Sequence, residues 1–464
     1  MPRLAPATRL AYGAPGFAFA LVGLPIYVHL PRFYADTLGV NLTFLGAAIL
    51  TSRLWDAVTD PAVGFVSDRI RTRFGRRRPF IAFGSVPLAL GAVLLLMPPS
   101  WLSPAALGWW FGAWLFVVFL AWTAVQIPHA ALGAELTDDH HERTSLFAVR
   151  DGLWILGTLV AAASPALARQ LLGATGGDER QVFAALALTF GFLLLVLPWV
   201  CVLGVREPTI TAAPSPVTPV EATREAWRNR PFRVMLLAYG IGALGAALPA
   251  TLVLFYVEHV LHAAHLGEAF LAAYFLVGVV CLPLWTRVAR RVGKKPAWLT
   301  AMALSVAAFS GAFFLGPGDT WWYGAIVVVS GIGFGAGLVL PASLVADTID
   351  YDEWQTGHRR EGLYYGLWSI VTKVSAAIGA AAALPALERA GYVAQATTQP
   401  ESVSLALRTM YAAVPCLCYA AAFLVAVRFP IDERRHGEIR RALDARAITS
   451  AEPGSAPSLG GASW

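Results

Sequence analysis

The sequence predicts an all-α, polytopic membrane protein with twelve transmembrane helices arranged in two six-helix halves. Of its 464 residues, 57% are apolar and only 14% are charged, whereas soluble domains carry about a quarter charged residues. Apolar runs long enough to cross a bilayer, which takes about 20 residues, recur along the chain. Short motifs also repeat after equivalent runs, which indicates two similar halves.

Twelve apolar runs have membrane length, six on each side of a polar stretch in the middle of the chain. They extend over Leu10 to Leu30, Leu42 to Phe65, Phe80 to Met97, Leu107 to Pro128, Leu146 to Ala168, Val182 to Val205, Val234 to Val257, Ala269 to Trp285, Ala297 to Leu315, Trp322 to Leu344, Tyr365 to Leu384 and Thr409 to Val427.

The polar stretches divide the chain into four parts. Residues 1–205 form the N-terminal half and residues 234–430 the C-terminal half. Residues 206–233, which contain Pro208, Pro214, Pro216 and Pro219 among small and charged residues, read as a linker between the halves. Residues 431–464 are polar and end in Gly, Ser and Pro, so we expect a disordered cytoplasmic tail.

The distribution of basic residues predicts the orientation. With the N-terminus inside the cell, 27 of the 35 Lys and Arg residues fall in cytoplasmic segments and only 5 fall outside. Cytoplasmic loops of membrane proteins carry such an excess of Lys and Arg. We therefore expect an integral protein of the cytoplasmic (inner) membrane with both termini cytoplasmic. The net charge of +6 then reflects topology and lipid contact, and no nucleic-acid partner is expected.

Two pairs of motifs repeat between the halves. Gly75-Arg76 after the second run matches Gly293-Lys294 after the eighth, and Glu135 after the fourth matches Asp347 after the tenth. Parallel repeats of this kind are typical of transporters whose binding site lies between the halves near the bilayer midplane.

Two carboxylates lie inside the second crossing. Asp56 and Asp60 are four residues apart and share one helix face, with Arg53 close to it. Charges buried in a membrane need a counter-charge, a cation or protons. The pair is therefore either a structural ion-pair network with Arg53 or Arg150, or a site for Na⁺ or H⁺.

Arg150 in the fifth crossing and Lys373 in the eleventh are the other intramembrane charges of interest. They come from opposite halves and must face the protein interior. They either bind a polar substrate, form a charge relay with the aspartates, or pin helices together through salt bridges.

The turn after the second crossing contains Asp68, Arg69, Gly75 and Arg76. Its arginines serve topology and contact with anionic lipid. Asp68 against the start of a neighbouring helix, with arginines nearby, would also make a latch that breaks when the cytoplasmic side opens. Both readings stay open at the level of sequence.

These motifs resemble those of the major facilitator superfamily, and within it the glycoside-pentoside-hexuronide:cation symporters. The resemblance covers nearly the whole chain. Its specific parts are Arg53 to Pro79, Ile127 to Asp139, and Ala346 to Glu353 leading to Lys373. It implies the major facilitator fold, with alternating access to a central site.

The resemblance also implies roles for single residues. Asp56 and Asp60 match the family's paired cation-binding aspartates, so that a Na⁺ ion would lie there, and Thr123 matches a hydroxyl ligand. Lys373 matches the lysine that approaches the cation site, and Arg150 the arginine that contacts sugar.

Three positions depart from the pattern. Thr59 stands where the family has an asparagine cation ligand. Ala20 and Gln126 stand where galactoside-carrying members have sugar-binding aspartates. The cation half of the machinery is thus present, whereas two charge-assisted hydrogen bonds to a sugar are lost.

We expect a monomeric symporter that couples a sugar or glycoside to Na⁺ or H⁺, with no cofactor beyond the coupling ion. The alternative is a symporter of an amphiphile such as a lysolipid. A transport-dead sensor is disfavoured because the coupling charges remain. An enzyme is not expected, because neither His140-His141-Glu142 nor the four cysteines make a convincing reactive constellation.

Overall fold

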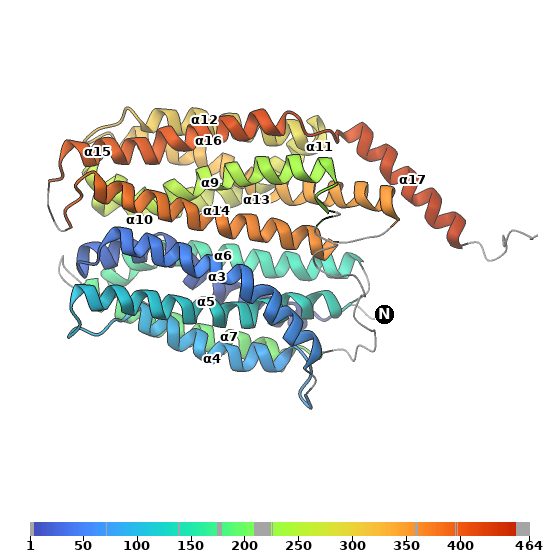
Figure 1. The fold of residues 1–464 in the computed structure, drawn as a ribbon, viewed down its shortest axis with the longest axis horizontal. Helices are drawn as coiled ribbons and strands as arrows, with labels where there is room; N and C mark the ends of the chain where they lie inside the picture. Colours follow the sequence, from blue (N-terminus) through green and yellow to red (C-terminus); the bar gives the residue numbers. More distant parts are fainter. Residues whose placement is uncertain are drawn as a thin grey trace, which may run out of the picture.

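The computed structural model describes residues 4–70, 72–137, 140–173, 179–207, 224, 226–357, 361–394, 396 and 398–451. Within these ranges every extended regular element is a helix, and the one isolated β-bridge joins Thr72 to Gly75. Figure 1 shows the helices running side by side in two layers, which are the two halves of the chain.

The N-terminal half contains six long helices and two short segments. They are α1 (Pro6–Tyr27), α2 (His29–Arg32), the π-helical segment η1 (Phe33–Thr37), α3 (Leu42–Arg69), α4 (Arg78–Leu96), α5 (Pro104–Glu135), α6 (His140–Leu172) and α7 (Glu179–Gly204).

The C-terminal half repeats this plan with two interrupted spans. Its elements are α9 (Arg230–His259), η2 (Ala264–Leu266), α10 (Gly267–Val280), α11 (Leu282–Val292), α12 (Lys294–Ala312), α13 (Thr320–Thr356), α14 (Glu361–Arg389), α15 (Glu401–Arg408), η3 (Thr409–Ala413) and α16 (Val414–Ala426), followed by α17 (Glu433–Ala451).

Side-chain caps fix several helix starts. The side chain of Asn41 accepts a hydrogen bond from Phe44 N at 2.9 Å, and that of Asn229 accepts one from Phe232 N at 3.1 Å. Such caps satisfy amide groups that the first helical turn leaves free. The Asn229 cap, followed by Pro231 at the helix start, explains why α9 begins four residues before the apolar run at Val234.

The spans agree with a twelve-helix protein. Among the described residues, nine helices are long and apolar enough to cross a membrane, and α10 with α11, bent by 42°, makes a tenth span. The other two long helices are α3, which carries Arg53, Asp56 and Asp60, and α12, which starts with two lysines. Their polar residues lower the hydropathy of helices that still lie in the bundle.

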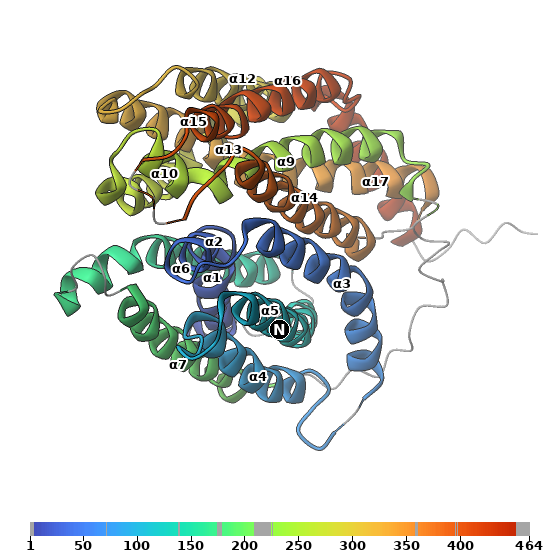
Figure 2. The ribbon, with the colours of Figure 1, turned by 60° about the vertical axis from the view of Figure 1, so that its left-hand side comes forward.

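Among the described residues, the halves meet mainly along two helix pairs. Helix α3 packs against α14, and α6 packs against α10. We call the end of the bundle that carries the N-terminus and α17 the linker end, and the end that carries α2 and α15 the far end (Figures 1 and 2). One apolar core runs through the N-terminal half into the far-end part of the C-terminal half. A second core is confined to the linker-end part of the C-terminal half. The apolar cores of the two halves therefore merge at the far end.

The predicted disordered tail is wrong for residues 433–451, which form α17 and pack against α13. The reason is electrostatic: His436 lies 3.0 Å and Arg440 3.4 Å from the carboxylate of Asp350. The sequence pattern of the tail contains no sign of this partner. Residues 452–464, also predicted as tail, lie outside the described residues, as does the linker segment 208–223.

Candidate functional site

A cavity of about 710 Å³ lies between the halves. Its lining includes five residues that the sequence singled out, and they come from both halves: Ala20, Arg53, Gln126, Arg150 and Lys373. The remaining lining includes eight aromatic side chains, which sequence reasoning missed because aromatic residues in membrane helices are usually packing residues. The aromatic residues are Phe19, Tyr27, Trp122, Trp154, Tyr239, Phe275, Phe334 and Trp368.

The acidic pair lies beside this cavity, at the contact between α3 and α14. Lys373 Nζ of the C-terminal half is 2.5 Å from Asp60 Oδ2 and 3.9 Å from Asp56 Oδ2 of the N-terminal half. Both aspartates are thus within reach of one ammonium group that crosses the interface. The resemblance implied that Lys373 approaches the two aspartates, and in the fold its ammonium group lies against them.

Asp56 is buried, with 2% of its surface exposed, and pairs with Arg53 at 2.7 Å. The Arg53 guanidinium is itself held by the Tyr27 hydroxyl and lies 3.6 Å from the centre of the Phe119 ring. This contact with an aromatic face stabilises a buried cation. Neither Tyr27 nor Phe119 has a sequence signal that could have indicated this role.

The acidic pair retains unsatisfied capacity for a cation. Asp56 Oδ1 is buried and has no hydrogen-bond partner, which is a costly state for a carboxylate oxygen. Asp60 Oδ1 accepts a hydrogen bond from the Thr123 hydroxyl at 2.8 Å. Carboxylate and hydroxyl oxygens are the ligands of hard cations, so these groups fit a small monovalent cation or a proton.

Thr59 is not part of this geometry. Its hydroxyl donates a hydrogen bond to the carbonyl of Trp55 in the preceding turn, at 3.2 Å. The residues searched for metal sites, which are the described ones, contain no group of three or more His, Cys, Asp or Glu side chains that could hold a metal ion. A cation at Asp56 and Asp60 would therefore share its shell with the Thr123 hydroxyl rather than with a third acid.

Further polar groups that face the cavity lie on α5 and α6. Arg150 is bonded to the neighbouring Asp151, with 2.8 Å between Nε and Oδ1, and its guanidinium lies over the ring of Phe147. Gln126 Oε1 accepts a hydrogen bond from Trp122 Nε1 at 2.8 Å, which leaves its amide group free to turn to a ligand. Asp151 is itself half exposed, so the Arg150–Asp151 pair presents both charges to the cavity.

Ala20 contributes no polar group, and α1 packs very closely against α6 beside it. A Cβ atom added to Gly157 would lie 2.5 Å from the carbonyl oxygen of Phe17 and 2.9 Å from the Cβ of Ala20. Ala20 is 2% exposed although it borders the cavity. The wall formed by α1 is therefore apolar and tightly packed.

The basic turn after α3 contacts acids other than the one predicted. The side chains of Asp68 and Arg69 lie outside the described part of the chain. Arg76 Nη2 lies 2.6 Å from Glu135 at the end of α5, and Arg77 lies 2.9 Å from the same carboxylate. Glu207 accepts the backbone N–H groups of Arg76, Arg77 and Arg78 at the start of α4, as an acid at a helix N-terminus does.

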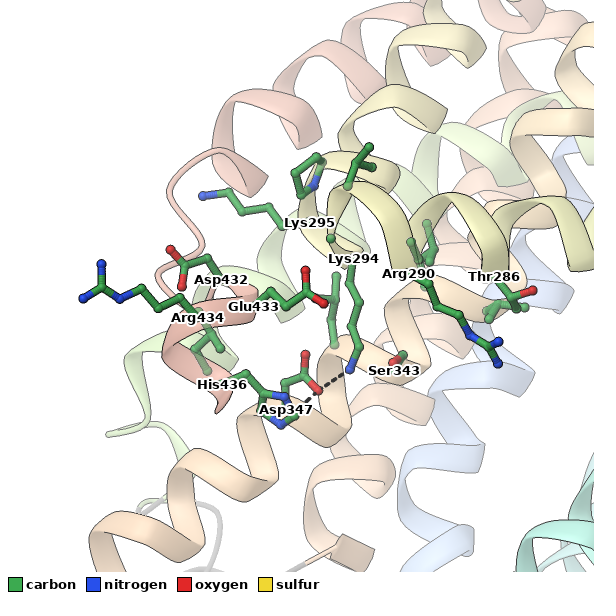
Figure 3. A pocket seen from close by; sticks show the side chains of 18 residues that line it. Thr286, Arg290, Lys294, Lys295, Ser343, Asp347, Asp432, Glu433, Arg434 and His436 are labelled. Carbon is green, nitrogen blue, oxygen red and sulfur yellow. Dashed lines mark hydrogen bonds and ion pairs between the residues drawn. The ribbon is translucent and has the colours of Figure 1, made fainter. Parts of the chain in front are cut away.

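Gly75 is required at this turn. Its φ of +111° is one that L side chains rarely adopt, and an added Cβ would overlap Glu207. The C-terminal half has an equivalent turn, in which Gly293 has a φ of +93°. Lys294 Nζ lies 2.5 Å from Asp347 there, as Arg76 lies against Glu135 in the N-terminal half. Figure 3 shows Lys294 and His436 pointing to Asp347. The repeated motifs thus form equivalent contacts within each half.

The far end is held shut by contacts between the halves. Arg32 Nη2 on α2 lies 2.5 Å from Glu258 on α9, and Arg169 Nη1 on α6 lies 2.9 Å from Glu268 on α10. We call these two ion pairs the far-end latch. Glu268 is nearly buried, and breaking a buried pair leaves an uncompensated charge. No spacing in the sequence indicates these partners, because 99 residues or more separate them.

A further contact at this end involves a titrating carboxyl group. Asp36 in η1 accepts a hydrogen bond from the Tyr392 hydroxyl of the other half. Burial raises the pKa of Asp36 to about 6, although Tyr392 and Arg32 favour its ionised form. Glu258 raises the pKa further, and His259 lies 3.4 Å from the Tyr392 hydroxyl.

We expect the closed far end to become more stable as pH falls. In the closed state the partly buried Asp36 has a pKa of about 6, whereas an Asp36 exposed by opening would have a pKa of about 4. The closed state therefore holds more protons between these values and gains stability there. Spin labels at Trp101→Cys and Leu405→Cys, in a background without native cysteines, report the opening. The closed fraction should rise from pH 7.5 to pH 5. The Asp36→Asn variant should show a smaller rise, because the contribution from protonation of Asp36 is removed. An unchanged pH response in Asp36→Asn contradicts the assignment.

Comparisons with known proteins agree with this architecture. The model of the family described as MFS/sugar transport protein matches residues 11–433. The glucuronide carrier protein homolog of Escherichia coli (strain K12) is 29% identical, with 93% of each chain covered. The putative glycoside/cation symporter YagG of the same organism is 25% identical, with 96% of each chain covered. The solved structure of the nucleoside transporter NupG aligns with a TM-score of 0.63 at 11% identity, covering 92% of this chain and all of that one, which shows a shared fold.

Proposed function

Because the chain belongs to the MFS/sugar transport family, and is therefore an integral membrane transporter rather than an enzyme, we propose that it couples glycoside uptake to a cation. Two of its relatives are named a glucuronide carrier protein homolog and a putative glycoside/cation symporter. The observation that supports coupling is the position of Lys373, whose ammonium group from one half lies against the acidic pair of the other half.

The proposed coupling follows from charge balance at this interface. Without a coupling ion, Lys373 neutralises Asp60 and Arg53 neutralises Asp56. A Na⁺ ion or proton that binds the pair competes with Lys373 for the same oxygens. Loading therefore weakens the ion pair between α3 and α14 and changes the relative stability of the two arrangements of the halves. By linkage, substrate that favours the loaded arrangement must tighten cation binding to the same degree.

The transport cycle we propose is alternating access between the two ends of the bundle. The far-end latch closes one end in this state. The excess of basic residues at the linker end supports placing that end in the cytoplasm, so this arrangement would be closed to the outside. The opposite arrangement requires the latch to break.

The cavity supports a glycoside as substrate. Arg150 and Gln126 offer hydrogen-bond donors, and the Trp122 and Trp154 rings line the same space. Small-molecule sites commonly combine aromatic side chains with a few polar groups that orient the ligand. Here the two tryptophan rings would pack against the apolar faces of a sugar, and Arg150 and Gln126 would bind its hydroxyl groups. The named relatives carry or are assigned glycosides, which favours this substrate class over the lysolipid alternative.

Uptake by purified protein in proteoliposomes tests the proposal. We expect accumulation of a labelled glycoside, chosen from a panel of neutral and acidic sugars, when an inward Na⁺ or proton gradient is imposed. Accumulation should stop when an ionophore collapses the active gradient. Uptake that is equal with and without both gradients contradicts coupling, and the absence of uptake for every sugar contradicts the substrate class.

Arg150→Ala should weaken glycoside binding by roughly tenfold or more, because a hydrogen bond from a charged donor contributes about 1.5–3 kcal/mol. Cation affinity should change much less, since Arg150 contacts Asp151 rather than the acidic pair. Isothermal titration of each ligand measures both effects, with Arg287→Ala, an exposed arginine outside the cavity, as the control. A larger loss of cation affinity than of sugar affinity would place Arg150 in the ion-pair network.

A further inference from the structure

A second cavity, of about 710 Å³, opens between α9, α14 and α16 in the C-terminal half. We call it the lateral groove. Its apolar lining includes both exposed side chains, such as Leu237 and Ile378, and buried ones, such as Leu236. The apolar lining residues used below are Leu237, Ile241, Leu244, Val371, Ile378 and Val425.

Three arginines lie at the linker end of the lateral groove. Arg230 and Arg233 come from the first turn of α9, and Arg428 follows the end of α16. All three are exposed, and within the described residues no hydrogen bond or ion pair involves their guanidinium groups. Trp227, which is half exposed, lies beside them. Positive charges thus gather at one end of an otherwise apolar groove.

The length of the groove corresponds to one leaflet of a bilayer. From Val234 to Leu244 the α9 backbone rises by ten residues, which is about 15 Å at 1.5 Å per residue. Half of the hydrocarbon thickness of a bilayer is also about 15 Å. The apolar part therefore spans the acyl region of a single leaflet, and the arginines and Trp227 lie at the level of the headgroups, where such residues are favoured.

We propose that the lateral groove is a binding site for an anionic glycerophospholipid in the leaflet at the linker end. Its phosphate would pair with Arg230, Arg233 and Arg428, and an acyl chain would lie along Leu237, Ile241 and Leu244. Basic pockets between transmembrane helices commonly bind such headgroups. The three positive charges at one end and the length of the apolar part match an anionic lipid, and both favour this occupant over a second protein chain.

The site lies on the back of the helix that carries Lys373. Val371 and Ser375 line the groove, while Lys373 between them faces the central cavity. The Ser375 hydroxyl donates a hydrogen bond to the carbonyl of Gly240 on α9, at 3.1 Å. A bound acyl chain would therefore pack against the contact that fixes α14 on α9.

Native mass spectrometry of the full chain, loaded with phosphatidylglycerol or with phosphatidylcholine, tests the proposal. We expect the wild type to retain phosphatidylglycerol in preference to phosphatidylcholine. The triple variant Arg230→Gln, Arg233→Gln, Arg428→Gln should lose this preference, with retention falling by about fivefold for each arginine removed. The matched control is Arg287→Gln, Arg290→Gln, Arg291→Gln, which removes three exposed arginines of α11 outside the groove and should retain the lipid.

A second variant tests the apolar part of the groove independently of the three arginines. Leu237→Trp fills the groove from an exposed position and should lower phosphatidylglycerol retention with all arginines in place, whereas Leu276→Trp, equally exposed on α10, should not. Equal retention of both lipids by the wild type overturns the proposal, as does equal loss in the triple variant and its control. If a second copy of the chain covered the groove, Leu237→Trp would instead change the oligomeric mass.

Discussion

Replacement of Asp60 by asparagine should abolish gradient-driven accumulation of substrate while leaving folded protein in the membrane. Asp60 is the acid closest to Lys373, and its other oxygen accepts from Thr123. Asparagine keeps the shape and the Thr123 hydrogen bond but removes the negative charge with which a coupling cation would pair. The measurement is uphill uptake in proteoliposomes at matched protein density, for which Asp319→Asn, a change of the same kind outside the cavity, provides the control.

The variant also separates coupling from binding. Arg150 and Gln126 do not contact Asp60, so equilibrium binding of substrate should persist while its enhancement by the cation disappears. If Asp60→Asn accumulates substrate against its gradient as the wild type does, the aspartate pair has no coupling role. The amount of monodisperse protein after purification serves as the control for folding. It shows whether a loss of substrate binding in the variant comes from misfolded protein.

Arg169→Gln should shift the protein strongly toward a state that is open at the far end. The substitution leaves Glu268 nearly buried without its cation, and removing one partner of such a pair costs about 3–5 kcal/mol. A shift of that size changes the ratio of closed to open states by roughly a hundredfold or more. The distance between spin labels at Trp101→Cys and Leu405→Cys should move from a short to a long population.

Two further variants make this expectation specific. Glu179→Gln removes the other partner of Arg169, which lies on α7 within the same half, and should leave the closed population unchanged. Adding Glu268→Gln to Arg169→Gln removes the uncompensated carboxylate, so the double variant should recover part of the closed population. A closed population that is the same in Arg169→Gln as in the wild type would show that the latch does not hold the far end.

The architecture could be predicted because it depends on patterns along the chain. Run lengths gave the spans, and the repeated Gly75-Arg76 and Gly293-Lys294 motifs indicated two equivalent halves. The grouping of Asp56, Asp60 and Lys373 followed from the resemblance to a family rather than from spacing, since Lys373 lies 313 residues from Asp60.

The features that the sequence did not predict depend on tertiary contacts, which leave no local pattern along the chain. Glu135 and Glu207 hold the basic turn in the described structure, and Glu207 lies in the polar stretch that read only as linker. The far-end latch joins residues near the ends of helices that belong to different halves. The α17 helix is stabilised by Asp350 on α13, so composition alone indicated disorder where a docking partner exists.

The close packing of α1 on α6 limits how the substrate range of this protein can evolve. Ala20 is 2% exposed and its Cβ would lie 2.9 Å from a Cβ added at Gly157, so a longer acidic side chain at this position would have little room on the side of α6. Gln126 differs, because it is a long polar side chain that already lines the cavity and accepts a hydrogen bond from Trp122. Relatives that acquire new sugars by single mutations should therefore vary first on α5, while the α1 wall drifts only through small apolar residues.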